Sequence, residues 1–150
     1  MNKFFSNSLT IALLIVAGLL ILRTLVGPSV AETPAVLTGS SDLNAAIERA
    51  EDEDKVVFAV ASAPWCGPCQ SYKRSTLADE SVQSWIRDNA VGIHINVDED
   101  REAAARLQVR SIPATFVIKD GTIVNKFTGA VSKDRLMRTL EPYTLATAAK

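Results

Sequence analysis

The chain opens with a long apolar stretch, after which short apolar runs alternate with segments of helical periodicity. Residues 9–22 carry no charge and are flanked by Lys3 and Arg23. This length suits the hydrophobic region of a signal peptide and falls short of the about 20 residues that span a bilayer comfortably. We therefore assign residues 1–26 to a signal peptide or a transmembrane anchor, with membrane association through residues 4–26.

Two fates of this leader remain open. The small residues Ser29-Val30-Ala31 allow a signal peptidase to cut after Ala31, whereas the three residues after Arg23 extend the apolar span if that side chain reaches back to the interface. A third interpretation, a buried core helix, is disfavoured by the terminal position. Both leader interpretations place the rest of the chain outside the cytoplasmic membrane, in a periplasmic or other extracytoplasmic compartment. Residues 27–40 hold two Pro and two Gly and predict a flexible linker.

Residues 41–145 show the patterns of one α/β domain. A continuous apolar run, VVFAVA, is typical of a strand buried on both faces, and Asp120-Gly121 between two strand patterns predicts a hairpin. The order αβαβαββα implies a central mixed sheet with helices on both faces. The expected helices run from a cap at Ser40, Ser41 or Asp42 to Glu51, over 66–77, 81–89 and 99–107, and from Ser132 to Pro142, and the expected strands are 56–61, 91–97, 115–118 and 123–127.

Composition excludes several classes of function. The 16 Lys and Arg residues nearly balance 17 Asp and Glu residues, which argues against nucleic-acid binding through a basic face. An apolar content of 47 % excludes a disordered chain. The two cysteines lie three positions apart, which excludes a disulfide scaffold between distant loops and a four-cysteine zinc site.

The candidate chemistry lies in Cys66 and Cys69, at the end of the buried strand and the start of a helix. The unpaired N–H groups and partial positive charge of a helix amino terminus stabilise a thiolate, so we expect the pKa of the Cys66 thiol to lie below its free value of about 8.5. Cys69, one helical turn later, is placed to form a disulfide with Cys66, and we expect it to be the more buried. Gly67 lets a partner's backbone approach, and Pro68 suits a first helical turn.

Two other uses of the cysteine pair stay open. A zinc site needs two further ligands, and His94 is the only additional soft or borderline ligand in the sequence. A purely structural disulfide across so small a loop adds little stability, because the entropic gain grows with loop length.

The segment Trp65-Cys66-Gly67-Pro68-Cys69 resembles the active site of the thioredoxin family, and Ser111-Ile112-Pro113-Ala114-Thr115 resembles the family's Ile-Pro-Thr segment. The resemblance covers roughly residues 41–141 and implies a thioredoxin fold. It also implies a cis bond before Pro113, an Ile112 backbone that pairs with an extended substrate, and a docking role for Gly129. We expect Trp65 to act as a lid beside the cysteines, and Trp85, which shares a helix face with Val82 and Ile86, to lie in the core.

A further stretch, from Arg74 to Val82, resembles a subgroup that includes the carboxy-terminal domain of the membrane disulfide reductase that carries electrons to the periplasm. Two positions depart from the family pattern. Val60 stands where the family has a buried Asp, and His94 stands where the family has the Lys that neighbours this Asp. Loss of both charges together is physically consistent, because either one left buried without its partner would be destabilising. His94 is either a hydrogen-bonded sheet residue or, alone or through water, the acceptor of the Cys69 proton.

The resemblance implies a thiol–disulfide oxidoreductase that reduces protein disulfides. Cys66 attacks a substrate disulfide, and Cys69 then resolves the mixed disulfide. We expect no metal or organic cofactor. The implied partners are disulfide-containing exported proteins and a membrane-borne electron donor, with no nucleic acid. The alternatives are a disulfide oxidant or isomerase on the same fold, and a binding module in which the cysteines are idle.

Overall fold

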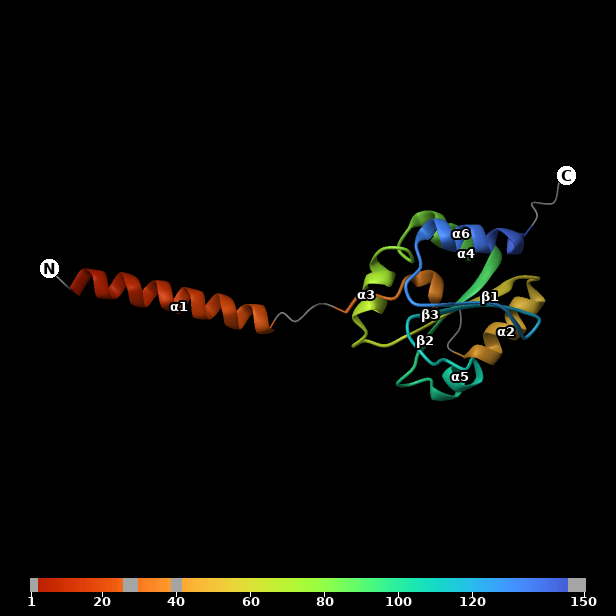
Figure 1. The fold of residues 1–150 in the computed structure, drawn as a ribbon, viewed down its shortest axis with the longest axis horizontal. Helices are drawn as coiled ribbons and strands as arrows, with labels where there is room; N and C mark the ends of the chain where they lie inside the picture. Colours follow the sequence, from red (N-terminus) through yellow and green to blue (C-terminus); the bar gives the residue numbers. More distant parts are fainter. Residues whose placement is uncertain (1–2, 26–29, 39–41, 146–150) are drawn as a thin grey trace. The chain divides into compact units, whose positions relative to one another are not determined.

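The computed structural model describes residues 3–25, 30–38 and 42–145, and the chain divides into two compact units, Met1–Val30 and Ala31–Lys150. Helix α1 (Lys3–Leu25) makes up the first unit (Figure 1). Across the described ranges, no helix combines the length and the apolar character needed to cross a membrane. This finding does not support the transmembrane-anchor interpretation of residues 1–26.

The second unit is built on one mixed sheet, as the sequence predicts. Its strand order is β2-β1-β3-β4, in which β1 pairs parallel with β2 and antiparallel with β3, and β3 pairs antiparallel with β4. The central strand is buried along its whole length, which accounts for its continuous apolar run. The strands are β1 (Val56–Ser62), β2 (Ala90–Asn96), β3 (Ala114–Lys119) and β4 (Thr122–Thr128).

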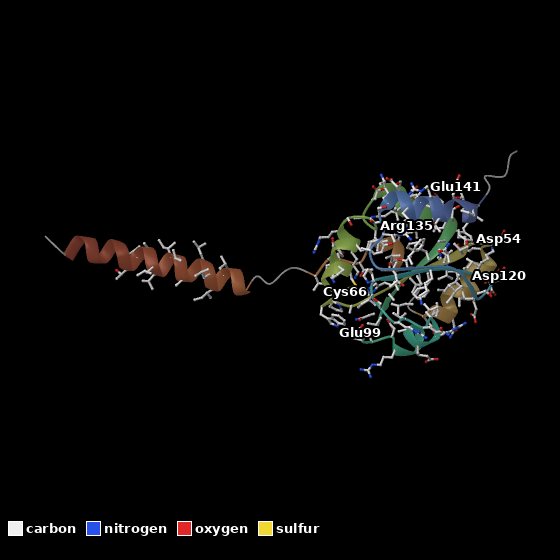
Figure 2. All side chains as sticks on the ribbon, viewed as in Figure 1. Asp54, Cys66, Glu99, Asp120, Arg135 and Glu141 are labelled. Carbon is white, nitrogen blue, oxygen red and sulfur yellow. A yellow bond between two sulfur atoms is a disulfide. The ribbon has the colours of Figure 1, made fainter. Side chains whose placement is uncertain are left out.

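Helices cover both faces of this sheet and bury one apolar core on each (Figures 1 and 2). Side chains of α3, α4 and α6 pack on the face that carries Phe58 and Val60, whereas α2 and α5 lie against the face that carries Val57 and Ala59. The helices are α2 (Leu43–Asp52), α3 (Gly67–Arg74), α4 (Glu80–Asn89), α5 (Arg101–Arg106) and α6 (Lys133–Leu140), with short 3-10 turns at η1 (Ala35–Leu37) and η2 (Glu141–Tyr143).

Three predicted helices, 66–77, 99–107 and 132–142, are longer than the observed α3, α5 and α6, and every element boundary except the end of α3 agrees to within two residues. Helix α3 ends at Arg74 rather than at residue 77, because the Ser75 hydroxyl donates to the Ser71 carbonyl at 2.8 Å and the chain then turns. Helix α5 begins at Arg101 rather than at residue 99, because the Asp100 carboxylate accepts the Asn96 N–H at 2.9 Å and holds the preceding residues in a turn.

Two local signals are confirmed. Asp42 caps α2, and its carboxylate accepts the Asn44 N–H at 2.7 Å, whereas the alternative caps Ser40 and Ser41 lie outside the described residues. Asp120 and Gly121 both have positive φ, 49° and 69°, as a two-residue hairpin turn requires, and they join β3 to β4.

The interpretation of residues 27–40 as a flexible linker is wrong for residues 31–38, which belong to the domain. Leu37 is 1 % exposed in the core beneath α4, and Thr38 forms a bridge with Ile93. The chain approaches β2 so closely that a Cβ at Gly92 would collide with the Val36 carbonyl, so this position requires glycine. The segment is too short to show an alternation of hydrophobic residues. The Pro and Gly content of residues 27–40 is typical of a linker, so the sequence does not reveal that residues 31–38 pack on the domain.

Candidate active site

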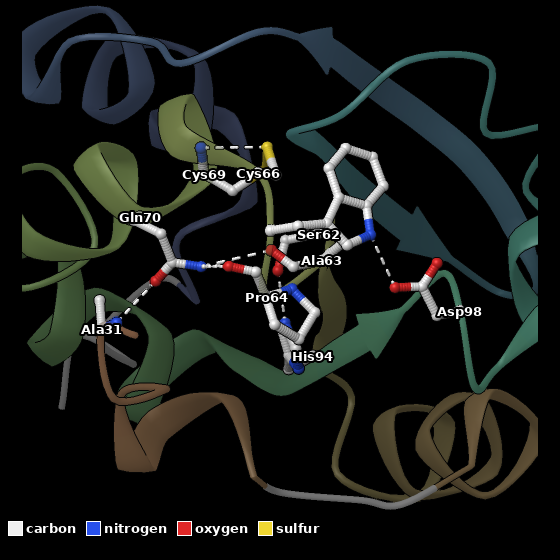
Figure 3. Close-up of a disulfide and its surroundings, with 10 residues drawn as sticks. Ala31, Ser62, Ala63, Pro64, Cys66, Cys69, Gln70, His94 and Asp98 are labelled. Atoms are coloured by element: carbon white, nitrogen blue, oxygen red, sulfur yellow. Dashed lines mark hydrogen bonds between the residues drawn. A yellow bond between two sulfur atoms is a disulfide. The ribbon is translucent and has the colours of Figure 1, made fainter. Parts of the chain in front are cut away.

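The cysteine pair lies where β1 passes into α3. Cys66 is the N-cap of α3, and its Sγ accepts the Cys69 N–H at 3.2 Å (Figure 3). The two residues form a disulfide with Cα atoms 5.2 Å apart. The Cys66 sulfur therefore occupies the place at the helix amino terminus where unpaired N–H groups and the helix dipole favour negative charge.

The two cysteines differ little in exposure. Cys66 is 4 % exposed and Cys69 is 1 % exposed, so the expected order is confirmed but both residues are buried. Val97 and Ile112 pack against the cluster that Ala63 forms with the cysteines, and these contacts cover Cys66. Gly67 and Pro68, between the cysteines, are exposed, which leaves the connecting backbone open to a partner.

Trp65 and Trp85 have the two different environments that the sequence predicts. Trp65 is 71 % exposed, and its Nε1 donates to Asp98 Oδ2 at 2.9 Å. Trp85 is 6 % exposed and contacts Phe58 edge-on in the core. Sequence analysis does not find the partnership of Trp65 with Asp98, because the two residues lie 33 positions apart.

The segment before β3 closes the site from the opposite side. The Ile112–Pro113 bond is cis, as the resemblance implies. The Pro113 carbonyl accepts the Gly129 N–H at 2.8 Å, and Gly129 adopts φ +87°, so these two positions lie side by side. Within the described ranges, the backbone of Ile112 forms no hydrogen bond, which leaves its N–H and C=O free for an extended segment. The substrate roles of Ile112 and Gly129 stay predictions.

Gln70 holds the approach to the active site and was not anticipated. Its Nε2 donates to the carbonyls of Ala63 and Pro64 at 3.3 and 3.1 Å, and its Oε1 accepts the Ala31 N–H at 2.6 Å (Figure 3). These bonds fasten the loop that precedes Cys66 to the first turns of α3. No local pattern marks a buried glutamine as a fastener, because its partners come from two distant segments.

His94 has a defined partner that is not a cysteine. Its Nε2 and the Ser62 hydroxyl lie 2.6 Å apart and share a hydrogen bond. Burial, with a further contribution from the Lys73 charge against an opposing one from Asp100, lowers the pKa of His94 from 6.5 to about 4. The imidazole is therefore neutral near pH 7. This geometry favours the hydrogen-bonded sheet residue, and the proton-transfer role stays a prediction.

Two further buried polar side chains of α3, those of Lys73 and Tyr72, have hydrogen-bond partners. Lys73 is 5 % exposed, its Nζ donates to Thr33 Oγ1 at 3.1 Å, and burial lowers its pKa. The buried Tyr72 hydroxyl shares a hydrogen bond with Thr115, and burial raises the pKa of Tyr72 to about 12. In the part of the chain that the structure describes, no three His, Cys, Asp or Glu side chains gather as metal ligands would.

Comparison with known proteins identifies the family of the chain. A family model described as a thioredoxin-like domain matches residues 43–144. Thioredoxin 1 of Synechococcus elongatus is 37 % identical over 81 residues, which cover 54 % of this chain and 73 % of that protein. The thioredoxin of Bacillus subtilis is 38 % identical over 87 residues, which cover 58 % of this chain and 81 % of that protein.

Solved structures agree with these sequence relatives. The X-ray structure of Fasciola hepatica thioredoxin superposes with a TM-score of 0.54 at 29 % identity and covers 67 % of this chain and 93 % of that one. Poplar thioredoxin h superposes with a TM-score of 0.58 at 26 % identity, covering 69 % and 90 % of the two chains. The chain therefore belongs to the thioredoxin-like family, and Cys66 and Cys69 form the dithiol–disulfide couple of a protein-disulfide reductase.

Proposed function

We propose that this reductase acts outside the cytoplasm, on disulfides of exported proteins, and is recharged by a membrane-borne electron donor. The observation that carries its chemistry is the Cys66 sulfur at the amino terminus of α3, beside the cis bond before Pro113. A sulfur in this place is stabilised as the thiolate, which is the attacking form in thiol–disulfide exchange.

Reduction proceeds in two exchange steps. The Cys66 thiolate attacks one substrate sulfur, so a mixed disulfide forms, the substrate disulfide breaks, and the second substrate sulfur leaves as a thiolate that takes up a proton. Cys69 then loses its proton and attacks the Cys66 sulfur. The Cys66–Cys69 disulfide forms, the mixed disulfide breaks, and two electrons have passed to the substrate. The structure holds the oxidised form that these steps leave behind.

The reductase step is tested by insulin reduction with dithiothreitol. We expect Cys66→Ser to reduce the rate to that of dithiothreitol alone, and Cys69→Ser to accumulate a mixed disulfide, because the resolving sulfur is missing. Ser71→Ala, at an exposed position of the same helix, is the control and should retain the wild-type rate. Equal activity of Cys66→Ser and wild type would favour the binding module over the enzyme.

The extracytoplasmic location is supported by two features of the amino terminus. Residues 9–22 carry no charge, and the compact domain begins at Ala31, so a cut after Ala31 removes one residue of the domain together with the hydrogen bond from its N–H to Gln70 Oε1. A reductant in such a compartment needs a supply of electrons across the membrane, which implies the donor. Mass analysis of the expressed protein tests this: we expect a product that begins at Glu32 in the exported fraction, and an uncut chain in the cytoplasm would contradict the proposal.

A disulfide oxidant or isomerase remains the second candidate on this fold. The Gly-Pro pair between the cysteines resembles the reducing members of the family. Equilibration of the pair with glutathione distinguishes the two, because a reductant has a potential near about −270 mV and a strong oxidant near about −120 mV.

A further inference from the structure

A pocket of about 380 Å³ lies beside the active site, and none of the described residues that line it is acidic. We propose that this pocket binds the substrate segment next to the disulfide, and that the preferred segment pairs an apolar side chain with a carboxylate. The inference rests on the proposed reductase function and adds to it the class of substrate that the enzyme selects.

The pocket is continuous with the cysteines. Val97 and Ile112 line the pocket, and the same two residues pack against the cluster that contains Cys66 and Cys69. Trp65, the residue before Cys66, lines it as well and is 71 % exposed. A substrate whose cysteine reaches Cys66 therefore places the neighbouring residues of the same chain segment at this pocket.

The chemistry of the lining calls for an apolar contact and an extended backbone. The free N–H and C=O of Ile112 lie at the edge of the pocket, where a strand-like segment pairs with them. An apolar side chain of that segment gains contact with the aromatic and aliphatic part of the lining. That part consists of Trp65, Val97, Ala104, Ala105, Val109 and Ile112.

The polar part of the lining supplies positive charge. Arg101 and Arg110 are both exposed and line the pocket, and neither forms an ion pair with a carboxylate of the residues described. Lys126 adds a third cation at the rim, because its Nζ donates at 3.1 Å to the carbonyl of Gln108, another lining residue. Asp98 brings one carboxylate to the same rim, because its Oδ2 accepts from Trp65 Nε1 at 2.9 Å, so three cations stand against one acid there. The chain as a whole has a formal net charge of −1, so this excess of positive charge is local. Charge complementarity selects a substrate carboxylate.

A second pocket, of about 310 Å³, shows the opposite charge. It is lined by Asp42, Glu99, Asp100 and Glu102 together with Arg101 and Arg106, and it lies at the start of α2 and α5 rather than beside the cysteines. An acidic substrate segment is repelled there and attracted to the pocket that adjoins Cys66. The two pockets therefore favour one orientation of such a segment across the site.

The test uses three synthetic peptides that carry one disulfide, one apolar residue beside it, and Glu, Gln or Lys at the next position. We expect the wild-type kcat/KM to be about three- to tenfold higher for the Glu peptide than for the Lys peptide, and this ratio to shrink as salt screens the charges. In Arg101→Gln/Arg110→Gln the ratio should fall toward one. Arg135→Gln, on α6 and apart from Cys66 in Figure 2, is the matched control for loss of an arginine charge and should keep the wild-type ratio.

The small uncharged disulfide 2,2′-dithiodipyridine separates the two levels of the proposal. We expect the control Arg135→Gln to reduce it at the wild-type rate. A wild-type protein that reduces it no faster than Cys66→Ser contradicts the reductase function itself. An active wild type that treats the Glu and Lys peptides alike, or whose preference survives in Arg101→Gln/Arg110→Gln, overturns the charge-selective pocket alone.

Discussion

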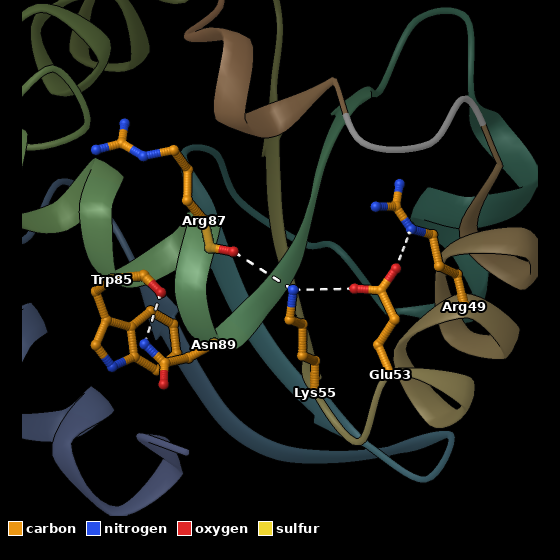
Figure 4. Close-up of polar contacts among 6 residues, drawn as sticks. All are labelled: Arg49, Glu53, Lys55, Trp85, Arg87 and Asn89. Atoms are coloured by element: carbon orange, nitrogen blue, oxygen red, sulfur yellow. Dashed lines mark hydrogen bonds and ion pairs between the residues drawn. The ribbon is translucent and has the colours of Figure 1, made fainter. Parts of the chain in front are cut away.

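The two ends of β1 are built for different purposes. At the amino end, Lys55 Nζ pairs with Glu53 at 2.9 Å, and Glu53 in turn pairs with Arg49 at 2.7 Å (Figure 4). The same Lys55 ammonium donates to the Arg87 carbonyl, and the buried Asn89 side chain donates to the Trp85 carbonyl at 2.9 Å. The polar groups at this end are paired within the protein and contribute to the fold.

The carboxyl end instead carries the groups that a partner would use. Trp65 is 71 % exposed, the Ile112 backbone is free, and Cys66 sits at the start of α3. Beneath these groups, Ser62 and His94 share a hydrogen bond, and Gln70 donates to the carbonyls of the loop before Cys66. These bonds hold the end of β1 and the loop in place. The contacts at the start of β1 therefore stabilise the fold, whereas its end positions the groups that perform the chemistry.

The largest effect that sharpens this comparison is expected from the two tryptophans. Trp85→Ala removes a buried ring that contacts Phe58 and whose Nε1 donates to Thr144 Oγ1, so we expect a loss of about 3–5 kcal/mol in the free energy of unfolding. The folded fraction should keep its rate of insulin reduction. Urea denaturation and activity per folded molecule check both points.

Trp65→Ala is the matched variant at the other end. Because Trp65 is exposed, we expect its loss to change stability by no more than about 0.5 kcal/mol while it slows reduction of peptide disulfides. A strongly destabilised Trp65→Ala protein with normal activity would contradict the division of roles between the two ends of β1.

A smaller effect is expected from the pH dependence of His94. Its pKa is about 4 in the folded protein and about 6.5 when unfolded, so between these values the unfolded chain binds more protons and stability falls as the pH falls. We expect His94→Gln to lose about 1 kcal/mol less than wild type between pH 7 and pH 4, because the imidazole is only half-buried and solvent screens part of its charge. Urea denaturation at a series of pH values measures the difference.

Glu53→Gln is the control from the opposite end of β1. Hydrogen bonds from Arg49 and then Lys55 lower the pKa of Glu53, so its contribution is present above pH 4.5 and is lost only as the pH falls below that value. Its stability profile should therefore follow the wild type between pH 5 and 6.5. Identical profiles of His94→Gln and wild type across that window would refute the assignment of a neutral, half-buried imidazole.

Local signals account for what the sequence predicts well. The apolar run of β1, the Asp120-Gly121 turn and the five residues from Trp65 to Cys69 each encode their structure within a few positions, and each is found as expected. The order of the predicted elements implies a mixed sheet, and the observed parallel and antiparallel pairing confirms it.

The contacts that the sequence hides join distant segments. Ser62 and His94 are 32 positions apart, Trp65 and Asp98 are 33 apart, and Gln70 reaches 39 positions back to Ala31. None of these partners can be chosen from periodicity or composition, because many serines, acids and backbone groups would serve equally well until the sheet register is known. The packing of residues 31–38 was hidden for the same reason.

The central claim is that the amino terminus of α3 stabilises the Cys66 sulfur as an anion. The most direct measurement is the pH dependence of alkylation of the reduced protein by iodoacetamide, with each cysteine followed by mass spectrometry and the urea-unfolded chain as reference. We predict that Cys66 reacts with a midpoint well below the free-thiol value of about 8.5, near the value of about 7 known for thioredoxin itself. A folded protein in which Cys66 titrates with the same midpoint as in the unfolded chain would contradict the claim.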